Sequence, residues 1–373
     1  DLNKARDAVS AEGFAGYSLF QNLICGGQRS EGLDSTNDLS FMCIEASMHV
    51  RLPQPSLSVR VHSTTPQDFL IKAAKLTRTG VGLPAYYNDE VIIPSLINRG
   101  LTMEDARDYN IIGCVEPQKA GKTDGWHDAA FFNMCRPLEL VFERGMSRGE
   151  MIGVDTGDVC EMKTFDEFYG AYKTQMNYMI KLLVNADNAI DSAHRLRAPL
   201  PFLSSMIEDC IGRGKSVQEG GAVYNFTGPQ GFGIANMADA LYAVKKLVYD
   251  EKRITMAQLK EAIWHNFGKD DTSAVYLTEQ IASELAKNGI TPDENVIRKI
   301  YNEVAGSTEN RYKEIYDMIE NVDKFGNDID EVDRFARDVA YTYSRPLQKY
   351  MNPRGGHYQA GLYPVSANVP LGG

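Results

Sequence analysis

A thiol and a carboxylate lie close together at Cys114 and Glu116, in the run Ile-Ile-Gly-Cys-Val-Glu-Pro-Gln at 111–118. In an extended or turning backbone, side chains at i and i+2 point the same way, so one bound molecule could meet both groups. A thiol supplies one-electron or nucleophilic chemistry, and a carboxylate beside it supplies proton transfer. The alternative is a buried structural cysteine. The glycine before and the proline after favour a loop tip that presents both side chains.

An imidazole and a second carboxylate follow at His127 and Asp128, at the end of the polar segment 119–128. A His–Asp step by itself is often a hydrogen-bonded pair in a protein core. After a loop that carries a thiol and a carboxylate, it is better interpreted as a pair of polar groups facing substrate in an apolar pocket.

The composition limits the class of protein. The chain has 373 residues, 43% hydrophobic and 24% charged, with a net charge of −11. This acidic balance argues against nucleic acid or an anionic membrane as partner, and no apolar run approaches the roughly 20 residues of a membrane span. The six cysteines are scattered without CxxC spacing, so we expect no metal site and reduced thiols in a cytoplasm.

Short strand-like segments alternate with long helical ones, which predicts an α/β layered or barrel fold. Residues 56–61 alternate with period two and predict a strand, and the acidic run 327–333 predicts the solvated start of a helix. The Gly-rich stretch 224–233 lacks the spacing of a nucleotide-binding loop. Helices are expected over most of 37–49, 65–76, 129–145, 164–195, 235–251, 255–266 and 270–350.

The run at 113–118 resembles the thiyl-radical loop of the glycyl radical enzymes, the superfamily of pyruvate formate-lyase. Further matches in family order lie at 51–56, 224–233, 352–356 and 363–366. The resemblance implies part of a ten-stranded α/β barrel with the Cys loop at its centre. It also implies that 1–373 form one incomplete barrel domain, without a separate second domain.

Within this superfamily, Trp126-His127-Asp128 is similar to the cobalamin-independent glycerol and propane-1,2-diol dehydratases. In those enzymes an aspartate at the position of Asp128 holds a substrate hydroxyl. Choline lyases instead tend to carry a hydroxyl residue where this chain has His127. The resemblance also places Phe20 at an aromatic wall of the pocket, and Tyr363 and Val365 on its far side.

The implied reaction is the dehydration of a small vicinal diol to an aldehyde. Cys114 would become a thiyl radical that takes a hydrogen atom from substrate, Glu116 would accept the hydroxyl proton, and His127 and Asp128 would orient the diol. No cofactor is expected on this chain, because the glycyl radical motif Arg-Val-x-Gly-Tyr/Phe is absent from its sequence. The radical would be installed on a missing C-terminal domain by a radical-SAM activating enzyme.

The resemblance further implies a homodimer that acts on a small-molecule substrate in the cytoplasm or inside a bacterial microcompartment. We expect the chain to be an internal fragment that also lacks the N-terminal part of the barrel, with its pocket histidine. Such a fragment should be inactive by itself.

Two other functions stay open at this stage. One keeps the radical core but breaks a different bond, as in C–N or C–S lyases or arylacetate decarboxylases. The segment 268–310, which is longer than in the diol dehydratases, favours that alternative. Asp128 favours a neutral polyol or a cation, since a carboxylate or sulfonate would require Arg or Lys. The other is a non-catalytic or accessory protein derived from this fold, against which the Cys114–Glu116 pair argues.

Overall fold

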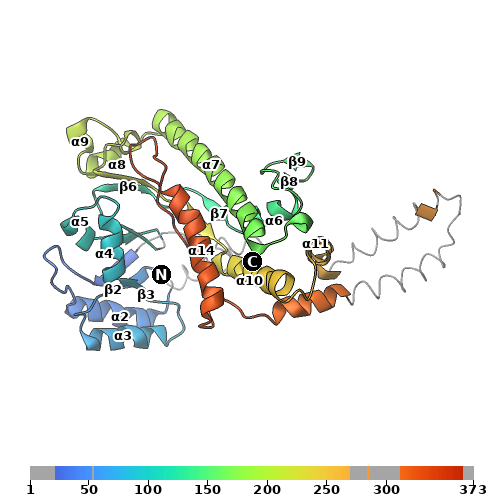
Figure 1. Cartoon of the computed structure of the whole chain (residues 1–373). Coiled ribbons are helices and arrows are strands. Elements are labelled where there is room, and N and C mark those ends of the chain that lie inside the picture. The colour runs from blue at the N-terminus through green and yellow to red at the C-terminus, as the bar shows by residue number, and fades with distance from the viewer. Residues whose placement is uncertain are drawn as a thin grey trace. The chain divides into compact units, whose positions relative to one another are not determined.

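The computed structural model describes residues 22–52, 54–113, 115–268, 284–285, 287 and 311–363 (Figure 1). The chain forms two compact units. The first comprises the chain up to Phe131, the stretch from Val184 to Gln230, and the chain from Leu347 onward. The second comprises Phe132–Leu183 and Gly231–Pro346.

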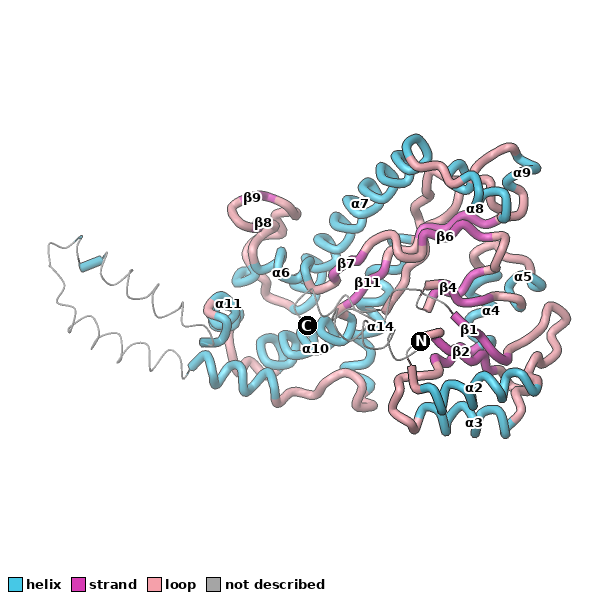
Figure 2. The backbone as a smooth tube through the Cα atoms, turned by 180° about the vertical axis from the view of Figure 1, so that it is seen from behind, coloured by secondary structure: helices cyan, strands magenta, loops and turns pink. Residues whose placement is uncertain are grey.

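The first unit begins with a parallel three-stranded sheet in the order β1 (Asn22–Gly26), β2 (Ser56–Val61), β3 (Ala85–Asn88). The crossovers are the helices α2 (Asp38–Val50) and α3 (Gln67–Thr77), which pack side by side (Figure 2). Leu57 and Val59 of β2 are fully buried in one cluster with Ile44 of α2 and Phe69 of α3. Parallel strands with helical crossovers bury their apolar residues in this way. The strand predicted at 56–61 is confirmed.

A buried ion pair connects this sheet to the next part of the unit. Arg60 donates two hydrogen bonds to Asp89, 2.9 and 2.8 Å long, and a third of 3.1 Å to the carbonyl oxygen of Tyr109. The Tyr109 hydroxyl donates to Asp89 at 2.8 Å. Asp89 begins α4 (Asp89–Ile97), and Tyr109 follows α5 (Met103–Arg107) and precedes β4 (Asn110–Ile112). The end of β2 and the start of β4 are therefore fixed to one another.

The rest of the first unit is built from segments that are distant in sequence. β4 pairs with β5 (Glu116–Gln118) as an antiparallel hairpin, and β6 (Thr123–Trp126) pairs in parallel with β10 (Tyr224–Thr227). The segment 347–363 runs beside β10, with parallel bridges from Thr227 to Tyr358 and from Gln230 to Gly361. Shorter helical elements of this unit are α8 (Pro201–Met206), α9 (Cys210–Arg213) and η2 (Val217–Glu219).

The second unit is mainly helical. The long helix α7 (Phe165–Arg197) lies in it up to Leu183. Phe165, Tyr169 and Tyr172 stack successively along one face of α7, with ring centroids 5.8 and 6.0 Å apart. The remaining elements lie wholly or mostly in this unit. They are β7 (Phe131–Asn133), α6 (Arg136–Phe142), β8 (Met146–Ser147), β9 (Glu150–Met151), η1 (Val159–Glu161), β11 (Gln230–Phe232), α10 (Ile234–Val244), η3 (Lys245–Asp250), α11 (Met256–Trp264), η4 (Asn266–Gly268), a helix at 311–320, and α14 (Asp330–Leu347).

Most of the predicted helices are confirmed, and their caps explain where they begin. Thr255 forms a capping box with Gln258 at the start of α11, and the acidic run starts α14 at Asp330. The helix predicted over 129–145 is wrong in part, because β7 occupies 131–133 and pairs with β11 before α6 begins. The segment 268–310 lies outside the described residues, except for 268, 284, 285 and 287. Among the described helices, none is both long and apolar enough to cross a bilayer.

Candidate active site

The hairpin of β4 and β5 places Glu116 at its tip, where Ile112 and Glu116 are paired. Gly113 has a φ of 59°, and a Cβ atom on it would lie 2.8 Å from the Glu116 carboxylate. Glycine is therefore required here, both for the backbone conformation and for room. The Glu116 carboxylate, only 4% exposed, folds back over the turn and accepts a hydrogen bond from the Val115 backbone N–H at 2.7 Å.

Cys114 lies outside the described residues, between Gly113 and Val115. Its predicted orientation toward the same cavity as Glu116 therefore stays a prediction. The described neighbours do form the tight turn that the sequence indicated, with strands on both sides. Asn22 of β1 anchors the turn by donating to the carbonyl oxygen of Gly113 at 2.8 Å.

Gln230 connects the two candidate carboxylates. Its side chain is fully buried, and its Nε2 donates to Asp128 at 2.7 Å and to Glu116 at 3.3 Å. The same nitrogen also lies 3.4 Å from the carbonyl oxygen of His127. One amide group thus holds Glu116 and Asp128 at a fixed separation, although they belong to different loops.

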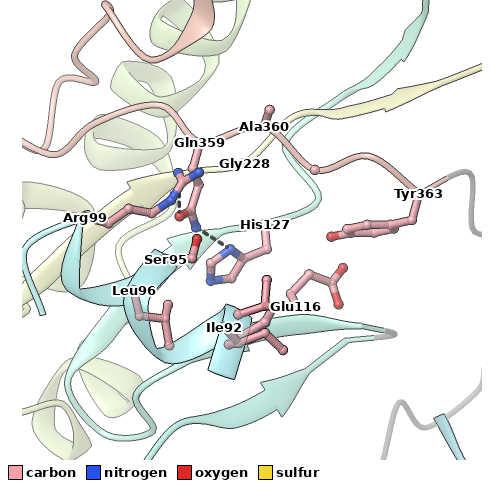
Figure 3. Close-up of a pocket in the computed structure, with 13 residues that line it drawn as sticks. Ile92, Ser95, Leu96, Arg99, Glu116, His127, Gly228, Gln359, Ala360 and Tyr363 are labelled. Atoms are coloured by element: carbon pink, nitrogen blue, oxygen red, sulfur yellow. Dashed lines mark hydrogen bonds between the residues drawn. The ribbon is translucent and has the colours of Figure 1, made fainter. Parts of the chain in front are cut away.

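His127 is 7% exposed and has an amide partner at each ring nitrogen. Nε2 lies 3.1 Å from Oε1 of Gln118, and Nδ1 lies 3.0 Å from Nε2 of Gln359. Figure 3 shows the Gln359 side chain between His127 and Arg99. Nη1 of Arg99 donates to Oε1 of Gln359 at 2.9 Å. Burial, with the nearby charges of Arg354 and Arg99, lowers the pKa of His127 to about 4. The imidazole is therefore neutral at physiological pH.

Glu116 and His127 line two adjoining cavities of the first unit. The larger, about 410 Å³, also contains Asp128, Trp126 and His194. Asp128 is more exposed than Glu116, and partial burial raises the pKa of its carboxyl group. The smaller cavity, about 190 Å³, contains Arg99, Gln359 and Tyr363, and Figure 3 shows the Tyr363 ring on the same side as the Glu116 carboxylate.

The structure thus brings together four of the predicted site residues, Glu116, His127, Asp128 and Tyr363. Phe20 and Val365 lie outside the described residues, so their place in the pocket wall stays a prediction. Sequence reasoning missed Gln118, Gln230, Gln359 and Arg99. A signal existed only for Gln118, which shares a strand face with Glu116 at period two. Within the described ranges, no group of three His, Cys, Asp or Glu side chains could hold a metal ion.

A second buried network supports the site from behind. The Arg354 side chain is fully buried and donates to Asp191 of α7 at 2.9 Å and to Asp124 of β6 at 2.9 Å. Its guanidinium also donates to the carbonyl oxygen of Phe226 in β10 at 2.7 Å. Because β6 leads directly into His127 and Asp128, Arg354 fixes the strand that positions them.

We expect Arg354→Met to lower the free energy of unfolding of this unit by roughly 3–5 kcal/mol, because it leaves two buried carboxylates without their cation. Arg197→Met, the same exchange at an exposed position at the end of α7 in this unit, should change it by less than about 1 kcal/mol. Urea unfolding followed by Trp126 fluorescence in a Trp264→Phe background measures both. Equal urea midpoints for the two variants would contradict this role of Arg354.

Comparisons with known proteins agree with this geometry. A model of the pyruvate formate lyase-like family matches residues 1–372. A structure on 1,2-propanediol dehydration in Roseburia inulinivorans is 61% identical, with a TM-score of 0.84, over 98% of this chain and 42% of that one. The glycerol-bound B12-independent glycerol dehydratase from Clostridium butyricum is 53% identical, with a TM-score of 0.81. The match covers 98% of this chain and 41% of the dehydratase. The (2S)-3-sulfopropanediol dehydratase of Klebsiella oxytoca is 36% identical over 365 residues, which are 97% of this chain and 39% of that protein.

The chain therefore spans about two fifths of the length of these relatives. The two superpositions confirm the predicted fold class, an α/β fold that forms part of the barrel of glycyl radical enzymes.

Proposed function

The chain belongs to the pyruvate formate lyase-like family, and from this premise we propose that it is the core of a glycyl radical dehydratase of small vicinal diols. The substrates proposed are glycerol or propane-1,2-diol, converted to an aldehyde. The relatives named for propanediol and glycerol dehydration support this choice, since they are 61% and 53% identical over almost the whole chain.

The observation that carries the proposal is the pair of carboxylates in one cavity. Glu116 and Asp128 both line the cavity of about 410 Å³, and Gln230 holds them together. The described residues that line it include no Lys or Arg. Two acceptor groups at a fixed separation suit a neutral molecule with two neighbouring hydroxyl donors. An arylacetate would bring a third carboxylate into this cavity, which disfavours decarboxylation.

In this proposal a backbone glycyl radical, installed by a radical-SAM activating enzyme, supplies the oxidising equivalent. Cys114, as a thiyl radical, takes a hydrogen atom from a hydroxyl-bearing carbon, and Glu116 accepts the proton of that hydroxyl. That proton is passed on to the neighbouring hydroxyl, which leaves as water, so Glu116 is a carboxylate again. The resulting carbon radical regains the hydrogen atom from the Cys114 thiol, so the thiyl radical is restored. A closed cavity protects these radical species from solvent and oxidants.

Asp128 would hold one hydroxyl of the diol, and His127 would help to orient the diol. Tyr363 would close the cavity on the side that faces Glu116, and Phe20 and Val365 would complete its wall. For the full-length protein we propose a cytoplasmic homodimer. Size-exclusion chromatography with light scattering tests the dimer, and a monomeric mass would overturn it.

A second candidate is a diol that carries an anionic tail. It is favoured by Arg99, which lines the adjoining cavity together with Glu116, and by the similarity to a sulfopropanediol dehydratase. A diol bound between Asp128 and Glu116 could extend its sulfonate toward the Arg99 guanidinium.

Aldehyde release by the full-length, activated protein tests both candidates. The substrates to compare are glycerol, propane-1,2-diol, 3-sulfopropanediol, choline and an arylacetate. Turnover of glycerol or propane-1,2-diol with the largest kcat/KM supports the main proposal, and a preference for the sulfonated diol supports the second. Turnover of choline or the arylacetate alone would leave a radical lyase but overturn diol dehydration.

Asp128→Asn should mainly weaken diol binding, because it removes a charge-assisted hydrogen bond worth about 1.5–3 kcal/mol. We expect KM for the diol to rise by roughly 10- to 100-fold, with a smaller change in kcat. Asp166→Asn, at an exposed position in the first turn of α7, makes the same chemical change away from the site. Steady-state kinetics on both variants is the measurement, and an unchanged KM in Asp128→Asn would show that Asp128 does not hold substrate.

A further inference from the structure

The chain of hydrogen bonds through His127 has only one possible direction. Arg99 lies at its end and can only donate, because a guanidinium has no acceptor. The Gln359 atom 2.9 Å from Arg99 must therefore be its carbonyl oxygen, and its NH₂ group then points toward His127. Figure 3 shows these three side chains in line along the smaller cavity.

This direction determines the protonation of the imidazole. Because Gln359 donates to Nδ1 at 3.0 Å, Nδ1 must be the unprotonated nitrogen. The proton of a neutral imidazole then lies on Nε2, from which it is donated to Oε1 of Gln118 at 3.1 Å. Every polar atom of the ring is satisfied in this one arrangement.

The ring also has no room to turn away. A Cβ atom at Gly125 would overlap the His127 ring, so the ring is packed directly against the backbone of β6. Gln118, which accepts the hydrogen bond from Nε2 of the ring, lies on β5 two residues after Glu116, and both side chains are buried. The chain from Arg99 to Gln118 thus ends on the strand that carries the proposed base.

We propose that Arg99, Gln359 and Gln118 are positioning residues that hold His127 as a neutral imidazole protonated at Nε2, so that no cation lies beside Glu116. The part that concerns Glu116 as a base rests on the proposed function, whereas the protonation of the ring does not. An imidazolium at this place would be a cation beside the proposed base, and it would weaken the ability of Glu116 to accept a proton.

The ionisable groups around the ring come from several elements. They are Arg99 just after α4, Glu116 of β5, Asp124 of β6, the adjacent Asp128, His194 of α7, and Arg354 of the C-terminal segment. Burial opposes a positive charge on the ring most strongly, and the two arginines oppose it further, which is why the pKa of His127 lies near 4.

Gln359→Glu tests the proposal, because a carboxylate can still accept from Arg99 but cannot donate to Nδ1. The ring would then face acceptors at both nitrogens and gain its second proton more readily. We expect the pKa of His127 to rise by roughly 1–3 units. Gln67→Glu, an exposed change of the same kind at the start of α3, should leave it unchanged.

The measurement is ¹⁵N NMR of full-length protein labelled in its histidine rings, with His127→Gln used to assign the signal. A neutral imidazole gives two well-separated ¹⁵N signals, and an imidazolium gives two similar ones. Wild-type protein should be neutral at pH 7, with Nε2 as the protonated nitrogen. A proton on Nδ1, an imidazolium, or an unchanged midpoint in Gln359→Glu would each overturn the proposal.

Kinetics separates the two parts of the proposal. Gln359→Glu should lower kcat at pH values below the new pKa of His127, and activity should return as pH rises above it, with little change in KM. A protonated His127 together with a wild-type kcat at every pH would overturn the proposed effect of the neutral ring on Glu116. If the wild-type protein turned over no diol at all, the proposed function would fail, while the NMR result would still decide how the ring is protonated.

Discussion

Cys114→Ser should abolish turnover of every substrate by the full-length, activated protein. The proposed reaction needs a side chain that exchanges a hydrogen atom with both a glycyl radical and a substrate carbon. A serine O–H bond is far stronger than a thiol S–H bond, so an alkoxyl radical cannot form at a useful rate. Because each 1.4 kcal/mol added to the barrier is about a tenfold loss in rate, no measurable activity should remain. Aldehyde release is the assay.

The control is Cys160→Ser, which makes the same exchange at a free cysteine in η1 of the second unit. It should keep near wild-type activity. Electron paramagnetic resonance should detect the glycyl radical in both variants, because the change affects its use and not its installation. Wild-type turnover by Cys114→Ser would refute the radical mechanism as a whole.

The elements that the sequence predicted correctly are those whose signals are local. The strand at 56–61 follows from alternation within six residues, and the start of α11 follows from the capping pair Thr255 and Gln258. The turn before Glu116 follows from Gly113 and Pro117, which limit the backbone on both sides. The helix predicted over 129–145 is wrong in its first part, because the pairing of β7 with β11 joins residues about 100 positions apart and no local pattern indicates it, whereas α6 is a helix as predicted.

The partners of the site residues depend on the same kind of long-range contact. Arg99 and Gln359 are 260 positions apart, and Gln230 is 102 positions from Asp128. No spacing rule connects such residues. For His127, the sequence left open a hydrogen-bonded buried residue, and its two amide partners agree with that alternative. Contact between His127 and substrate therefore stays a prediction, whereas Asp128 does reach the cavity.

Glu116→Gln should reduce kcat severely without abolishing it. General acid–base groups typically contribute roughly 10²–10⁴-fold, and the amide cannot accept the hydroxyl proton of the diol. The larger loss should fall on kcat, because the base is removed, and KM should rise by a smaller factor. Glu104→Gln, at an exposed position in the first turn of α5, makes the same chemical change away from the cavity and should leave both constants unchanged.

The structure also predicts a second effect of this substitution. Glu116 accepts hydrogen bonds from the N–H of Val115 and from the NH₂ group of Gln230, one at each carboxylate oxygen. A glutamine has a single acceptor oxygen, so its own NH₂ group must face one of these donors. The Gln230 bond is the longer of the two, at 3.3 Å, so we expect it to break first, which would loosen Asp128 as well. A modest rise in the diol KM beside the large fall in kcat is therefore expected. A wild-type kcat in Glu116→Gln would show that the carboxylate at Glu116 is not the base.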